Sequence, residues 1–200
     1  MWIWSLEWLL LALLIFWVTG ALKRFKRLSA GIKQAFAPVE SQLAELIALL
    51  RDCARMQEIK DRVNSNPLTH VHLALMPCAD LLEVSLERAA RQPLQPETIA
   101  ALGTAWEGAQ VAWQTYVQQS EAYAQAQATQ DAALQECQQR WLHMVTLYQH
   151  SAEQFNASVH NYNRAITQFP ASVVARIRGL QTVRPLHQDA AQQMQLTHDA

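Results

Sequence analysis

The chain has 200 residues and a net charge of −1, with sixteen Lys or Arg residues against seventeen Asp or Glu residues. Five of the basic residues lie within residues 23–33, so the remainder is mildly acidic, which argues against a nucleic-acid-binding surface. Cys53, Cys78 and Cys137 are odd in number, widely spaced and without a C-x-x-C pair. This pattern argues against a disulfide framework or a zinc site, and it favours reduced thiols in a reducing compartment.

Residues 2–22 form an apolar run that is interrupted at three positions, one of which is Glu7. A helix of about 20 residues spans the hydrocarbon core of a bilayer, and Glu7 would lie near the outer interface, where its charge costs less. We therefore predict a transmembrane anchor over residues 1–22. A cleaved signal peptide is the alternative, but no Lys or Arg precedes the run and residues 19–21 form a weak cleavage site.

Basic residues follow the apolar run directly. Because positive charges near the end of a span stay on the cytoplasmic side, they place the long C-terminal part in the cytoplasm and the N-terminus outside. The same charges could also contact anionic lipid headgroups. The predicted juxtamembrane segment is residues 23–33, and its basic residues are Lys23, Arg24, Lys26, Arg27 and Lys33.

The first bundle helix carries an apolar stripe in steps of four and three residues, the spacing that keeps one face toward a partner helix. Pro38 predicts a kink or a helix that begins there. The Asn-Ser-Asn-Pro cluster at residues 64–67 should end this helix. The stripe consists of Ile32, Phe36, Val39, Leu43, Leu46, Leu50 and Cys53.

Two further helices are predicted in the middle of the chain. A short one covers Cys78 to Arg91, with Pro77 near its first turn, and residues 92–96 form the next break. Pro96 suits the first turn of the third helix. Residues 118–130 contain no large aliphatic side chain, so they are either a turn or a continuous polar helix.

The last long helix has the most regular stripe, which ends at Pro170. Its members are Trp141, Val145, Tyr148, Ala152, Phe155, Val159, Tyr162, Ile166 and Phe169. Glycine is scarce, and no run alternates apolar and polar residues over the length of a strand. The sequence therefore predicts an all-α fold, in which an N-terminal transmembrane helix precedes an antiparallel four-helix bundle over residues 34–170.

The C-terminal tail combines apolar and basic residues. A short amphipathic helix is predicted over residues 171–185, and it could dock on the bundle or lie on the membrane. Residues 186–200 are polar and are predicted to be flexible.

A motif crosses the end of the last helix and continues into the tail. Its members are Phe155, Asn156, Val159, Tyr162, Asn163, Ile166, Phe169, Pro170, Ala175 and Gly179. This register resembles the LemA family of single-pass bacterial membrane proteins. The first helix is similar to the family's early helix at Ile32, Ala35-Phe36, Val39-Glu40 and Gln42-Leu43.

Several family positions differ in this chain. Glu45 and Leu46 stand where paired arginines are expected, and Val145 stands in place of a glutamate. The resemblance implies one span, basic residues and a helical bundle at the bacterial inner membrane. The family is not associated with a reaction, a cofactor or nucleic acid, so the resemblance implies no catalytic residue, no cofactor and no metal.

The polar residues leave two roles open for the motif asparagines. Asn156 and Asn163 either bond across helices and set their register, or line a polar groove for a peptide or a headgroup. His143, His150 and His160 are too widely spaced along one helix to converge on zinc. No nucleophile elbow, P-loop or dinucleotide motif occurs in the sequence.

These observations predict a non-enzymatic interaction or scaffold module. Its expected partners are membrane lipids through the anchor and other proteins, including a second copy of the chain. A lipid-sensing or membrane-shaping scaffold that uses the basic juxtamembrane and C-terminal segments is the alternative. A metal-dependent enzyme is a third.

Overall fold

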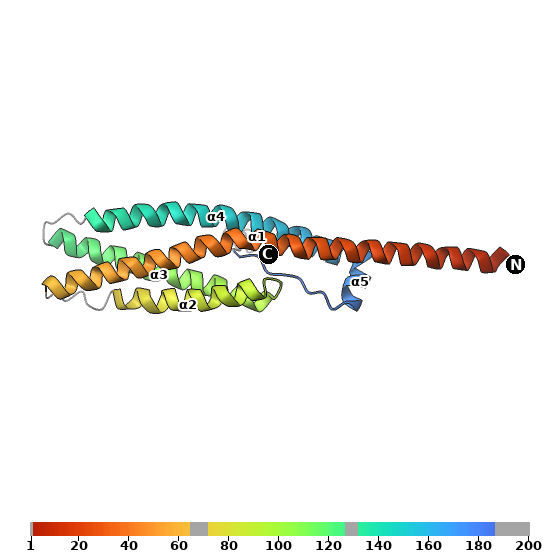
Figure 1. Ribbon diagram of the computed structural model, residues 1–200, viewed down its shortest axis with the longest axis horizontal. Helices are drawn as coiled ribbons and strands as arrows, with labels where there is room; N and C mark the ends of the chain where they lie inside the picture. The colour runs from red at the N-terminus through yellow and green to blue at the C-terminus, as the bar shows by residue number, and fades with distance from the viewer. Residues whose placement is uncertain (1, 65–71, 127–131, 187–200) are drawn as a thin grey trace, which may run out of the picture.

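The computed structural model describes residues 2–64, 72–126 and 132–186 (Figure 1). The regular secondary structure of these residues is entirely helical, and the helices are α1 (Trp2–Asn64), α2 (His72–Arg91), α3 (Pro96–Ala126), α4 (Ala132–Thr167) and α5 (Ala171–Ile177). The first four run in alternating directions, and α1 packs against both α4 and α2, while α2 packs against α3 (Figure 1). The predicted all-α bundle is confirmed.

α1 is one helix of 63 residues, and its N-terminal part projects beyond the other helices (Figure 1). Large apolar side chains between Trp8 and Phe16 are exposed, up to 79% at Phe16. Among the described residues, α1 is the one helix long and apolar enough to cross a membrane. The same helix then enters the bundle, so the predicted anchor and the first bundle helix are one continuous element.

Pro38 lies inside α1, which continues through it. Phe36 and Val39 on either side are buried, and their packing outweighs the one backbone hydrogen bond that proline cannot donate. The carbonyl left without that donor belongs to Gln34, an exposed residue, so water can satisfy it. The predicted helix start at Pro38 is therefore wrong, whereas every residue of the predicted stripe is buried.

α2 begins at His72, earlier than the predicted start at Cys78, and contains Pro77. Leu75 and Ala79 are both fully buried, so the turns before and after the proline pack into the core. This packing extends the helix past a residue that sequence rules treat as a boundary. The predicted end at Arg91 agrees with the structure.

Aromatic rings fill the space between α3 and α4. The ring centroid of Trp106 lies 4.6 Å from that of Tyr148, and Trp113 stacks on Trp141 with centroids 4.7 Å apart. These bulky rings explain why α3 and α4 approach each other less closely than α1 and α4 do.

The polar stretch 118–130 is helical as far as Ala126, where α3 ends. α4 starts at Ala132 and runs in the opposite direction, so α3 and α4 are two helices (Figure 1). Residues 127–130 of the stretch lie outside the described residues.

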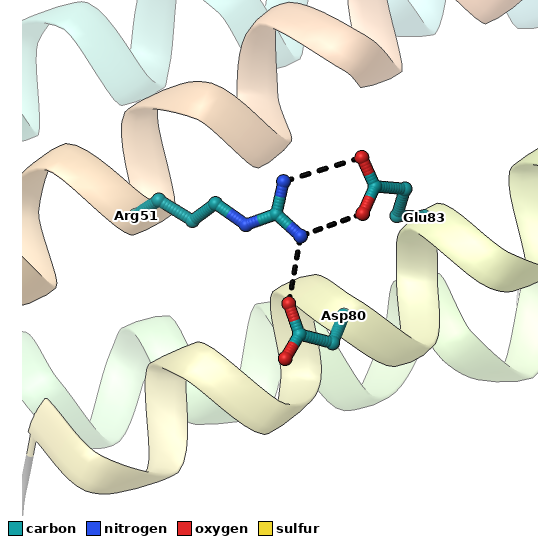
Figure 2. A network of polar contacts seen from close by, with 3 residues as sticks. All are labelled: Arg51, Asp80 and Glu83. Carbon is teal, nitrogen blue, oxygen red and sulfur yellow. Dashed lines mark hydrogen bonds and ion pairs between the residues drawn. The ribbon is translucent and has the colours of Figure 1, made fainter.

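A polar network joins α1 to α2 at the bundle surface (Figure 2). The Arg51 guanidinium donates to both carboxylate oxygens of Glu83, at 3.2 and 2.6 Å, and to Asp80 at 2.7 Å. These bonds raise the pKa of Arg51, with Glu83 the larger cause, and Arg51 lowers the pKa of Glu83. The bidentate bonding of Arg51 to Glu83 favours one position of α2 along α1.

Candidate functional site

The apolar members of the motif on α4 form part of the core. Phe155, Val159, Tyr162 and Ile166 are at most 5% exposed. The Phe155 ring packs edge-on against Phe36 of α1, with centroids 5.5 Å apart. Burial also raises the pKa of the Tyr162 phenol. These side chains therefore hold α4 in the bundle.

Asn156 and Asn163 bind the backbone of the chain's own C-terminal segment, residues 180–186. Asn163 Nδ2 donates to the Val183 carbonyl at 2.8 Å, and the Val183 N–H donates to Asn163 Oδ1 at 2.9 Å. The Leu186 N–H donates to Asn156 Oδ1 at 2.8 Å. Two positions about two turns apart on α4 therefore present one amide each to an extended peptide.

The spacing of the two asparagines matches the dimensions of an extended chain. Seven helical residues rise about 10.5 Å, and three extended residues, from Val183 to Leu186, span about 10 Å. The side chains of Val183 and Leu186 are 2% and 3% exposed, so the segment also contributes to the core. The two amides thus hold the backbone of the chain's own C-terminal segment, a contact that neither predicted role named.

α5 is shorter than predicted and ends at Ile177, not at residue 185. Its inner side is Val174 and Ala175, which are 7% and 3% exposed and dock on the bundle. Val173 and Ile177, on the outer side, are 52% and 79% exposed. The helix therefore docks through one side and leaves an apolar strip on the other.

Gly179 lies just after the end of α5 and reverses the chain. Its φ of +65° lies in the left-handed region, which glycine adopts without steric cost. The Gly179 N–H donates to the Arg176 carbonyl at 3.1 Å, and the Leu180 N–H donates to the Ala175 carbonyl at 3.0 Å. This paired capping pattern directs the C-terminal segment back along α4.

Phe169 and Pro170 form the corner between α4 and α5. Phe169 is 84% exposed, so its predicted place on the buried stripe is wrong. The reason is that α4 ends at Thr167, and a residue beyond that end no longer lies on the face that packs against α1.

A family model described as LemA family matches residues 81–197, more than half of the chain. The chain belongs to the LemA family. The matched range contains the whole motif of α4 and the tail, whereas the similarity in the first helix lies outside it. No curated protein and no solved structure matches the chain. LemA is not known as an enzyme family.

In this LemA-family protein the motif builds one local structure. Its apolar residues pack α4, its two amides hold the C-terminal segment, and its glycine allows the turn that brings the segment back.

The five basic juxtamembrane residues are all exposed on α1. Lys26 and Lys33 line a cavity of about 440 Å³ together with Arg178 and Leu180, which follow α5. The docking of α5 thus brings Arg178, the basic residue at its end, to the basic segment of α1.

Sequence reasoning missed a contact between two cysteines. The Sγ atoms of Cys53 on α1 and Cys137 on α4 lie 2.7 Å apart, and both residues are buried. This contact, followed by burial, raises the pKa of Cys53. The sequence did contain a signal for this contact. Cys137 lies four residues before Trp141, so it continues the apolar stripe of α4 by one step.

Other polar groups do not assemble a metal site in the described ranges. There, no group of three or more His, Cys, Asp or Glu residues is placed to hold a metal ion. His143, His150 and His160 are exposed along α4. The buried Tyr148 hydroxyl has no hydrogen-bond partner among the described residues, and its pKa is raised by burial.

Proposed function

We propose that this LemA-family protein is a non-enzymatic, membrane-anchored scaffold that presents a helical bundle to protein partners. In this proposal it is a single-pass protein of the bacterial inner membrane, with its N-terminus outside and its bundle in the cytoplasm. The observation that carries the proposal is the continuity of α1 from its apolar projecting part into the bundle.

A continuous helix has consequences for how partners would meet the bundle. A flexible linker would let the bundle rotate freely near the membrane, whereas α1 passes without interruption from exposed Trp8 to buried Ile32 and on to Cys53. The anchor therefore fixes the tilt and the height of the bundle together. Such fixed presentation suits a scaffold, because each outer face of the bundle then has a defined orientation.

The partner surface is expected on the outer faces, since the apolar motif residues of α4 are buried in the core. Leu81 and Val84 are three residues apart on α2 and are 59% and 47% exposed. Residues three apart on a helix share one face, so these two form an apolar strip on the side of the bundle. The partner could be another protein or a second copy of this chain.

Photo-crosslinking in intact membranes tests the proposal. A photoreactive residue at Leu81 or Val84 should give a protein adduct, and one at Glu153, an exposed polar position on α4, should not. Alkaline extraction of the same membranes should leave the protein in the pellet. The scaffold proposal is wrong if no position gives an adduct under conditions that capture a known membrane complex.

A second candidate, a lipid-sensing scaffold, is favoured by the cavity that Lys26, Lys33 and Arg178 line together. Three cations around one cavity attract anionic headgroups, and salt screens that attraction. In vesicles, anionic lipid should slow amide hydrogen exchange in residues 178–180, and added salt should reverse the effect. Equal exchange in anionic and neutral vesicles would remove this candidate.

A further inference from the structure

An amphipathic cavity lies where α1 leaves the bundle. It measures about 890 Å³ and is bounded on one side by α1 and on the other by the corner between α4 and α5. Leu10, Leu14 and Trp17 contribute to the α1 wall, and Phe169 contributes to the corner. The volume is within the range of small-molecule binding sites.

Polarity changes along this cavity in one direction. The α1 wall is apolar from Leu10 to Ala21, and its one charged residue, Arg24, lies at the end nearest the bundle. The corner contributes the polar side chain of Gln168 close to apolar Phe169. An occupant should therefore be apolar over most of its length and anionic at one end.

The position of the cavity on α1 points to a lipid of the cytoplasmic leaflet. Its apolar wall is part of the same run that is long enough to span a bilayer, and Arg24 falls just after that run, at the level of headgroups. The nearly fully exposed ring of Phe169 lies beside this wall, and Val173 and Ile177 continue the exposed apolar surface along α5. The cavity is thus continuous with the surface that would face acyl chains.

We propose that this cavity binds one anionic phospholipid, with an acyl chain against Leu10–Ala21 and Phe169 and the headgroup phosphate at Arg24. This inference rests on the proposed membrane anchoring of α1. The bound lipid joins the anchor to the α4–α5 corner, so the corner is a second point of membrane attachment.

Two variants with matched controls separate the lipid site from general effects. Gly20 lines the cavity, and a Cβ built there meets nothing within 4 Å, so Gly20→Phe adds a bulky side chain to the cavity wall without a clash at its Cβ. Gly31 has the same open surroundings on α1 but does not line the cavity, so Gly31→Phe is its control. Arg24→Gln removes the headgroup partner, and Arg27→Gln removes one equal charge outside the cavity.

The full chain and the four variants would be isolated from membranes, and bound phosphatidylglycerol and phosphatidylcholine counted by native mass spectrometry. The wild type, Gly31→Phe and Arg27→Gln should retain one phosphatidylglycerol. Gly20→Phe and Arg24→Gln should reduce its occupancy about tenfold. Equal lipid retention in all five proteins, or equal retention of the two lipids, would overturn the site.

Alkaline extraction of the same membranes keeps this result separate from the proposed anchoring. If the wild type remains in the pellet but retains no specific lipid, the site is wrong and the anchor stands. If the wild type is released, the anchoring fails and the site fails with it. If a second copy of the chain occupies the cavity instead of a lipid, the wild type should appear as a dimer and Gly20→Phe should dissociate it. That result also overturns the lipid assignment.

Discussion

Substitution of Asn163 by Ala should detach the C-terminal segment while leaving the bundle folded. The change removes two hydrogen bonds to the Val183 backbone, one donated by the amide and one accepted by it. A net contribution of about 1 kcal/mol for each bond gives about 2 kcal/mol for the pair. Since about 1.4 kcal/mol corresponds to a factor of ten, the opening of the segment should become about 30-fold more frequent.

Amide hydrogen exchange on the full chain in micelles measures this opening at the Val183 and Leu186 N–H groups. Asn161→Ala is the matched control, because Asn161 is exposed on the same helix and the gain in helix propensity is the same. Asn156→Ala removes one bond and should accelerate exchange about fivefold, mainly at Leu186. The reasoning is refuted if Asn163→Ala and Asn161→Ala exchange at equal rates at both amides.

Three further predictions concern the bundle core and its surface network. Tyr148→Phe should stabilise the fold by about 1 kcal/mol in thermal unfolding, because the substitution removes a buried hydroxyl without a described partner. Burial raises the pKa of Tyr148, so the wild type should lose stability as the pH rises above about 10, the ordinary pKa of tyrosine. Tyr148→Phe should lessen that loss. Destabilisation by Tyr148→Phe would mean that the hydroxyl has a partner. A mild thiol oxidant should form a disulfide between Cys53 and Cys137 in the folded chain. Mass spectrometry would detect the disulfide as a loss of about two mass units, and Cys53→Ser should abolish that loss. Failure to form the disulfide would contradict the contact between the two thiols. Because Arg51 lowers the pKa of Glu83, the stabilisation from this ion pair should be present above the ordinary pKa of the carboxyl and be lost as the pH falls through the lowered pKa. In denaturant titrations at a series of pH values, Arg51→Gln should reduce this loss of stability in acid. An unchanged dependence of stability on acid pH would refute the network.

The periodic parts of the fold could be predicted from the sequence. The stripe from Ile32 to Cys53 is buried throughout, and α2 and α3 end and begin at Arg91 and Pro96 as expected. Prolines caused errors because local rules weigh one missing hydrogen bond, whereas the packing of Phe36 and Val39 around Pro38 decides the outcome.

The candidate site was only half predictable. Asn156 and Asn163 are seven residues apart, which puts them on one side of α4, but their partners lie at Val183 and Leu186, in a segment with no periodic signal. Gly179 was visible in the sequence, but the direction in which it turns the chain depends on how α5 docks. Pairing between α4 and an extended segment is a long-range contact, which helical spacing alone cannot reveal.

The central claim is that α1 places the bundle against the membrane, and the depth of the α4–α5 corner relative to the bilayer tests this claim most directly. Spin labels at Phe169→Cys and, for comparison, at Leu142→Cys would be measured in vesicles, with Cys78→Ser removing the partly exposed native thiol. Both native side chains are exposed and apolar, but only Phe169 lies beside the apolar run of α1. The account predicts that the label at 169 collides with oxygen dissolved in lipid and is shielded from a water-soluble relaxant, while the label at 142 behaves in the opposite way. Equal access of the water-soluble relaxant to both labels would contradict the placement of the bundle against the membrane.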